Sequence, residues 1–200
     1  AVSILRSCCL TDQDKFYCRL RDQGSGSVVL KGLPSCITSG SIPKPAFYAY
    51  RLLKILCGDL LFWDQHCYII RSDTQPETWI LILINYNQDI LNLCSRNASI
   101  HETKDVISTF RDELQVDFRL ALPPGKYTVI QTAFSNANSI FSHMAQLGFP
   151  DHFPLSNLLS QYFSTEPQTQ MRTEDVSGTM DISSSISGVG VHVTIIQKQM

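Results

Sequence analysis

Hydrophobic residues recur at helical spacing in one well-marked stretch of the first third of the chain, residues 45–56. Pro45 suits the first turn of a helix, because the first N–H groups of a helix are unpaired and the fixed φ of proline fits there. Gly58 follows the stretch and is typical of a helix C-cap. The spacing predicts a helix that begins at Pro45 and is capped by Gly58, with an apolar face of Ala46, Phe47, Ala49, Tyr50, Leu53, Ile55 and Leu56.

After Asp59 the hydrophobic pattern takes on the character of strands. Residues 115–120 alternate between polar and apolar, and the Pro124-Gly125 turn makes residues 127–132 the expected partner strand. Short strands with turn signals between them predict an antiparallel β-sandwich. The other expected elements are strands at 60–63, 67–71, 79–86, 177–187 and 189–197, and short helices at 139–147, capped by Gly148, and 154–163.

The residues before the predicted helix carry weaker signals. Residues 1–10 have the pattern of a helix end, and residues 16–20 are an aromatic and apolar strand candidate. Residues 24–27 and 33–41 are rich in turn residues. A lone short parallel strand with a helix on each side cannot bury both of its faces. This part of the chain therefore needs further strands to form a core.

Composition narrows the classes of function. Charged residues make up 17% of the chain and apolar residues 44%, against a usual charged share of about 25%, so we expect another part of a larger protein to cover some surface. The net charge of −2 and the pI near 6.2 exclude a basic footprint for nucleic acid. The longest apolar run, residues 79–84, is too short to span a bilayer. The first residues lack a signal-peptide layout, so we expect the chain to begin within a longer protein.

Cysteine and histidine usage favours neither disulfides nor metal. The seven cysteines are an odd number, and no C-x-x-C pair or Cys/His ligand spacing occurs. Cys57 and Cys67 lie in apolar runs, where a free cysteine behaves as a small hydrophobe. We therefore predict a reduced, cytoplasmic protein with buried thiols, no metal site and no cofactor. The histidines are dispersed and are His66, His101, His143, His152 and His192.

Three motifs carry a resemblance to a known family. Residues 42–53 read Ile-Pro-Lys-Pro-Ala-Phe-Tyr-Ala-Tyr-Arg-Leu-Leu and are followed by Gly58-Asp59. Residues 84–87 read Ile-Asn-Tyr-Asn, and residues 122–127 read Leu-Pro-Pro-Gly-Lys-Tyr. In this order they resemble the last barrel helix, a strand ending in Asn-Tyr, and a Leu-Pro-x-Gly-x-Tyr turn of glycoside hydrolase family 39, which contains β-xylosidases and related enzymes.

The resemblance extends over roughly residues 30–200, since a short helix ending at 147–150 and the segment 155–163 follow the same order. It implies a fold that is mainly β with some α. Residues 1–58 would be the terminal strand and helix of a (β/α)8 barrel. Residues 59–200 would be a C-terminal antiparallel β-sandwich with two short helices. A barrel needs eight strands to close, so most of it would lie upstream.

The same resemblance bears on catalysis. Glycoside hydrolysis needs two carboxylates that flank the scissile bond, and in family 39 both are Glu residues on barrel strands four and seven, which would precede residue 1. The first Glu of this chain is Glu77, already within the expected sandwich. The chain alone is therefore not expected to be an enzyme, whereas its parent protein is a candidate retaining β-xylosidase.

Barrel strand eight is the part of the active face that the chain would contain. Tyr17 and Asp22 are the candidate carbohydrate-binding residues at this position. Cys18 stands where the family has Trp, and Arg21 where it has Ser, which removes stacking area and adds a charge. The alternative is that Tyr17 and Asp22 only pack and hydrogen-bond at the barrel rim.

Three functional hypotheses follow. The favoured one is a non-catalytic sensor region of a sugar-responsive AraC-type transcription regulator, because strand eight is altered, a signal peptide is lacking and the cysteines are free. The alternative is a domain that braces the barrel of a β-xylosidase. A third is a carbohydrate-binding module, which requires Trp63, Trp79 or Tyr86 to be exposed together, so that burial of all three would exclude it. The candidate partners are the upstream barrel domain of the same protein, a sugar and a second copy of the chain, with no nucleic-acid contact from these residues and no membrane.

Overall fold

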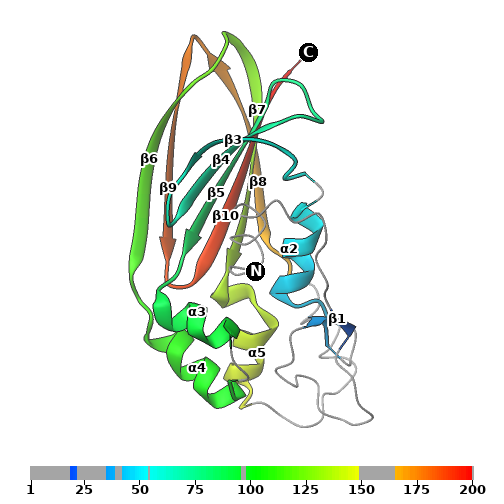
Figure 1. Ribbon diagram of the computed structural model, residues 1–200, viewed down its shortest axis with the longest axis vertical. Helices are drawn as coiled ribbons and strands as arrows, with labels where there is room; N and C mark the ends of the chain where they lie inside the picture. Colours follow the sequence, from blue (N-terminus) through cyan, green and yellow to red (C-terminus); the bar gives the residue numbers. More distant parts are fainter. Residues whose placement is uncertain are drawn as a thin grey trace.

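The computed structural model describes residues 19–21, 35–38, 42–53, 55–95, 98–148 and 165–199. Its largest element is a six-stranded antiparallel sheet in the order β3-β4-β5-β10-β7-β8 (Figure 1). The bounds of these strands are β3 Gly58–Trp63, β4 Cys67–Ser72, β5 Thr78–Asn85, β7 Gly125–Ser135, β8 Gln168–Val176 and β10 Gly190–Lys198.

A second, two-stranded antiparallel sheet lies over one face of the larger sheet. It consists of β6 (Glu113–Ala121) and β9 (Thr179–Ser187). Figure 1 shows this pair on one side of the larger sheet and the helix α2 (Pro45–Leu53) on the other. The predicted fold class, mainly β with some α and an antiparallel β-sandwich, is confirmed.

Short helical elements and one small parallel sheet complete the described part. The small sheet pairs β1 (Arg19–Arg21) with β2 (Ser35–Ile37). The strand expected near residues 16–20 thus finds its partner in a segment whose sequence indicated only turns. The remaining elements are α3 Gln88–Ser95, α4 Ile100–Thr109, the 3-10 helix η1 Asn136–Asn138 and α5 Ile140–Gln146.

Two hydrophobic cores lie on the two faces of the larger sheet. On one face Tyr68 and Ile70 of β4 pack with Ala49 of α2. On the other face Leu81 and Leu83 of β5 pack with residues of β9 and β6. Because β5 is buried on both faces, its sequence is an unbroken apolar run, whereas β6 and β9 face water on one side and alternate.

Two sequence predictions about pairing and capping are wrong. The strands β6 and β7 do not pair, because the segment around Leu122 carries the chain from one sheet to the other, where β6 pairs with β9 and β7 with β8 and β10. Gly58 does not cap α2, which ends at Leu53. Gly58 opens β3 with φ of +148°, and a Cβ added there would lie 2.0 Å from the carbonyl oxygen of Arg71.

Other predictions are confirmed, missed or untested. The helix predicted at 139–147 is α5, with Ser139 as its N-cap. The helices α3 and α4 and the strand β8 were not predicted. Cys67 is buried as expected, but Cys57 is exposed. The helical segments expected at residues 1–10 and 154–163 lie outside the described residues.

Candidate functional site

The segment around α2 joins the small parallel sheet to the larger antiparallel sheet. Residues 36–38 lie alongside residues 42–44. The Lys44 N–H donates to the carbonyl oxygen of Cys36 at 2.8 Å, and the Thr38 N–H donates to that of Ile42 at 2.9 Å. Pro43 forms an isolated bridge with Ile37 of β2. The Ile-Pro-Lys-Pro motif thus fixes the start of α2 against a parallel strand.

The far side of α2 belongs to the sandwich. Ala49 is fully buried, and Leu52 and the following Leu56 pack against the same core of β4, β5 and β10. The ring of Tyr48 lies 6.4 Å from that of Phe134 on β7. A single short helix therefore contacts both the parallel and the antiparallel sheet. We call this element the junction helix.

The lysine that precedes the junction helix is buried. Its Nζ donates to Ser35 Oγ on β2 at 2.9 Å, and Ser35 Oγ donates to the carbonyl oxygen of Ile37 at 3.1 Å. A buried ammonium group is costly unless it is hydrogen-bonded. Lys44 is thus part of the interior between β2 and α2, and not a solvent-facing charge.

The strand β3, which follows the junction helix, forms an apolar outer edge of the larger sheet. Within the described residues β3 pairs only with β4, and all six of its residues are exposed. Since directly paired residues point to the same face, Leu60 and Trp63 lie on the face of α2 and Phe62 on the sandwich side. The exposed fractions are 39% for Leu60, 50% for Leu61, 46% for Phe62 and 59% for Trp63. We call these four side chains the β3 edge.

The Ile-Asn-Tyr-Asn motif serves the fold. The Asn85 amide donates to the carbonyl oxygens of Asp112, Ile186 and Gly188 at 2.8, 2.9 and 2.9 Å, which ties the end of β5 to β9 and to the start of β6. Tyr86 donates its hydroxyl proton to the carbonyl of Gln65 at 2.9 Å. The Asn87 side chain accepts from the N–H of Ile90 and so caps α3.

The Leu-Pro-Pro-Gly-Lys-Tyr motif is also structural. Tyr127 is fully buried, and its hydroxyl donates to the carbonyl oxygen of Pro123 at 2.8 Å. The Leu122 N–H donates to the carbonyl of Gly178 at 3.0 Å, in the turn between β8 and β9. This arrangement, in which a tyrosine bonds the backbone a few residues upstream, is the corner device of β-sandwiches. Both motifs therefore hold the two sheets together.

A polar cluster lies between the two sheets. Ser184 Oγ of β9 and His192 Nδ1 of β10 are 2.8 Å apart, and Gln131 Nε2 of β7 donates to Ser184 Oγ at 3.4 Å. Burial lowers the pKa of His192 below its ordinary value. Burial, with a contribution from the Asp64 carboxylate, raises the pKa of Cys67 to about 12, so that thiol stays protonated at neutral pH.

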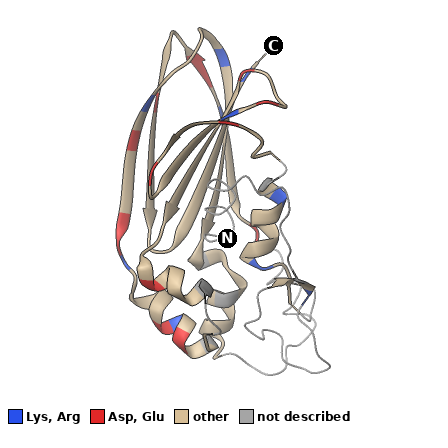
Figure 2. Cartoon of the chain, in the orientation of Figure 1, with Lys and Arg blue, Asp and Glu red and all other residues tan. Residues whose placement is uncertain are grey.

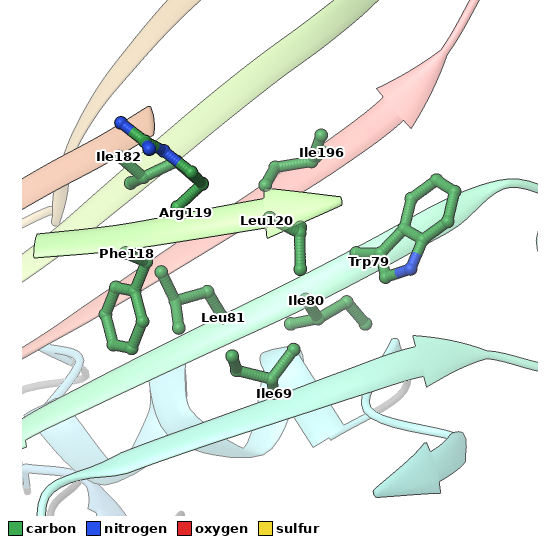
Figure 3. A pocket seen from close by; sticks show the side chains of 9 residues that line it. All are labelled: Ile69, Trp79, Ile80, Leu81, Phe118, Arg119, Leu120, Ile182 and Ile196. Carbon is green, nitrogen blue, oxygen red and sulfur yellow. The ribbon is translucent and has the colours of Figure 1, made fainter. Parts of the chain in front are cut away.

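A small apolar cavity lies between the sheets. Figure 3 shows its lining side chains, which come from β4, β5 and β10 of the larger sheet and from β6 and β9 of the two-stranded sheet. Its volume is about 30 Å³, against about 150 Å³ for a cavity that holds benzene. Arg119 lies at the rim, where it forms an exposed ion pair with Asp181. The cavity is too small for a sugar or a cofactor.

The predicted site residues do not come together. Tyr17 and Asp22 lie outside the described residues. Trp63 is exposed on the β3 edge, whereas Trp79 lies half-buried against Tyr127, with ring centres 6.2 Å apart. Tyr86 is buried. Of these three aromatic side chains only Trp63 is exposed, so they do not form a shared carbohydrate platform.

Charge and ligand chemistry bring no further site into view. Figure 2 shows Lys and Arg scattered over several elements, with no single basic face in this view. No cluster of three potential metal ligands occurs among the described residues. Within the same residues, no helix is both long and apolar enough to cross a bilayer.

Comparison with known proteins gives a likeness in structure alone. No protein-family model matches the sequence, and no curated protein matches it. A GH39 enzyme from Xanthomonas axonopodis pv. citri is similar with a TM-score of 0.68 and 17% identity, over 90% of this chain and 36% of that chain. A monomeric β-xylosidase from Caulobacter crescentus CB15 is similar with a TM-score of 0.67 and 17% identity, over 88% of this chain and 35% of that chain. A GH39 β-xylosidase from Caulobacter crescentus is similar with a TM-score of 0.58 and 17% identity, over 89% of this chain and 34% of that chain.

The chain therefore spans about a third of the length of these structures. It has the fold of their C-terminal β-sandwich region. At 17% identity this likeness concerns the fold alone.

Proposed function

We propose that this chain is the C-terminal region of a glycoside hydrolase family 39-like protein, in which the sandwich braces an upstream catalytic barrel. The observation that carries the proposal is the junction helix, which packs on a parallel β-pair at one side and on the core of the antiparallel sheet at the other. As the last helix of a barrel, it would make the cores of the two domains continuous.

The β3 edge supports the same proposal. Its four exposed apolar side chains directly follow the junction helix in the chain. Exposed apolar edge strands are uncommon in proteins that work alone, because they invite aggregation. Contact with the rest of a larger protein would remove this surface from water.

The hypothesis of an AraC-type regulator receives less support than this bracing role. The similar structures are described as a GH39 enzyme and two β-xylosidases. These descriptions favour a hydrolase parent. The regulator would instead require a helix-turn-helix module upstream.

The proposal can be tested on the complete polypeptide from which this chain derives. We expect it to hydrolyse a nitrophenyl xyloside and to unfold in one calorimetric transition. Ala49→Asp places a charge in the core beneath α2 and should lower both the unfolding temperature and the half-life of activity on heating. Arg51→Ala, on the exposed side of the same helix, is the matched control and should change neither. A folded polypeptide without turnover would contradict the hydrolase role.

Cysteine labelling gives an independent test of the bracing contact. Cys57 is exposed beside the β3 edge, whereas Cys67 is buried. Labelling of Cys57 should be fast in the 200-residue chain and slow in the complete polypeptide, while Cys67 stays slow in both. Equal labelling of Cys57 in the two proteins would show that the β3 edge remains uncovered and would refute the bracing contact.

A further inference from the structure

We propose that Ser184 and His192 form a pH-sensitive latch that holds the two-stranded sheet on the larger sheet at neutral pH and loosens it in mild acid. The proposal is independent of the bracing role. It rests on the placement of one ionisable side chain in the space between the two sheets.

The latch joins the centre of one sheet to the other sheet. His192 lies on β10, between Leu83 of β5 and Ala133 of β7. Its Nδ1 is 2.8 Å from the Oγ of Ser184 on β9, and Ser184 is only 6% exposed. This is a side-chain hydrogen bond across the sandwich, among contacts that are otherwise mainly apolar.

The pattern of donors and acceptors in the cluster fits a neutral imidazole at His192. Gln131 Nε2 donates to Ser184 Oγ, so the hydroxyl proton of Ser184 is available for His192 Nδ1, which then acts as the acceptor. A proton added at Nδ1 turns this nitrogen into a donor. The Ser184 oxygen would then face two donors, and its own proton would have to find a new acceptor.

The surroundings of His192 offer no compensating negative charge among the described residues. The inward faces of β5, β6, β7 and β9 carry apolar side chains, hydroxyl groups and the amides of Gln131 and Asn85. On the same face of the larger sheet, Cys67 of β4 and Tyr127 of β7 have pKa values that burial raises, so both are uncharged at neutral pH. Arg71 of β4 pairs with Asp59, and Lys198 of β10 pairs with Glu77. Arg172 and Glu174 on β8 pair with each other. The charged groups on the outward faces of β6 and β9 are Glu113, Asp117, Arg119 and Asp181.

The direction of the pH effect follows from linkage. Burial lowers the pKa of His192 in the folded protein below its unfolded value near 6.5. The unfolded chain therefore binds this proton first as the pH falls. The stability that the neutral imidazole provides is complete above pH 6.5 and is lost as the pH falls from there toward the lowered pKa.

The position of the latch decides which elements respond. Ser184 lies two residues before Ile186 on β9. The Asn85 amide donates to the carbonyl oxygen of Ile186 and also to that of Asp112, which lies between α4 and β6. Loosening of β9 at this end would therefore also release β6 and the end of α4. Among the described hydrogen bonds, none joins a side chain of β3, β4 or β8 to the side chains of this cluster.

Hydrogen exchange at individual amides tests the proposal. In the wild-type chain, protection factors in β9 and β6 should be several-fold lower at pH 5.5 than at pH 7.5, while those in β4 and β5 change little. His192→Asn keeps an acceptor oxygen but cannot titrate, so it should abolish this difference. His101→Asn, at an exposed position on α4, should retain it.

Two results would overturn the latch. One is equal protection of β9 at both pH values in the wild-type chain, and the other is a selective loss that persists in His192→Asn. If that variant fails to fold, an NMR titration of His192 in the wild-type chain decides the question. The imidazole must then titrate below pH 6.5, over the same pH range in which β9 loses protection. Titration of the imidazole in a pH range other than that of the protection loss would refute the proposal.

Discussion

The two outer strands of the larger sheet, β3 and β8, differ in the polarity of the side chains that they expose to water. Both are open on one side among the described residues. The sequence of β8 is Gln-Thr-Gln-Met-Arg-Thr-Glu-Asp-Val, polar on both faces, with Met171 as its one large exposed apolar side chain. The sequence of β3 ends in Leu-Leu-Phe-Trp, all exposed. Charged and polar side chains protect an edge strand from pairing with other chains.

This difference lies in the side chains that the two edges present, apolar on β3 and polar on β8. β8 is suited to remain in water. β3 is suited to be covered by protein, and it lies next to the junction helix in the chain. Under the proposed bracing role, the contact with the rest of a larger protein would lie at the β3 end of the sheet, and each prediction below tests one part of this comparison.

The largest effect is expected in the middle of the sheet, on which both edges depend. Asn85→Ala removes one amide that serves three backbone carbonyls. We expect a loss of about 4 kcal/mol, because each buried group left unsatisfied costs roughly 1–3 kcal/mol. Urea unfolding measures this loss. Asn92→Ala, exposed on α3, is the control and should cost less than about 0.5 kcal/mol. A loss below about 1 kcal/mol for Asn85→Ala would show that the middle of the sheet does not depend on this amide.

Much of the fold could be predicted from the sequence. Strong local patterns predicted β4, β5, β6 and β10, and Pro45 marked the first residue of α2. The failures have physical causes. The partner of β6 is β9, some 60 residues later, and alternation fixes which face a strand buries but not which strand it pairs with. The open strand β8 lacks an apolar side and therefore has no strand-like hydrophobic pattern.

One missed element had a usable signal. Ser99 caps α4 by accepting from the N–H of Glu102, and Ser-x-x-Glu is a recognised helix start. The hydrogen bond between Ser184 and His192 had no such signal in the sequence. Ser184 and His192 are eight residues apart on two strands of different sheets. Their contact depends on tertiary structure, which no spacing rule contains.

The next effect concerns how each edge is anchored. Gly58→Ala should cost about 3 kcal/mol, from backbone strain together with overpacking, because its Cβ would meet the Arg71 carbonyl at 2.0 Å. Gly178→Ala, in the turn between β8 and β9, is the matched control. Its φ is +136° but the surrounding space is open, so only the strain of about 1 kcal/mol remains. Equal losses in thermal unfolding would mean that β3 adapts its backbone as readily as the turn.

A smaller effect distinguishes an edge that is covered from one that is not. Phe62→Lys should leave the stability of the 200-residue chain nearly unchanged and reduce its aggregation, since Phe62 is 46% exposed there. In the complete polypeptide the same change should cost about 1 kcal/mol, as the rest of this ring would be buried. Met171→Lys on β8 should cost nothing in either protein. An identical response of the two edges would remove the basis of the comparison.

The smallest effect concerns the charges of β8, which we interpret as protection of the edge and not as a source of stability. Arg172 and Glu174 form an ion pair with side-chain exposures of 48% and 33%. Water screens such a pair, so Arg172→Ala should change the free energy of unfolding by less than about 0.5 kcal/mol. The same change leaves a longer uncharged stretch on an open strand, so aggregation at high protein concentration should increase. Light scattering and urea unfolding of the same samples separate the two quantities. A stability loss without added aggregation would mean that the ion pair stabilises the fold. The charges of β8 would then not be protection of an open edge, and the contrast with β3 would fail.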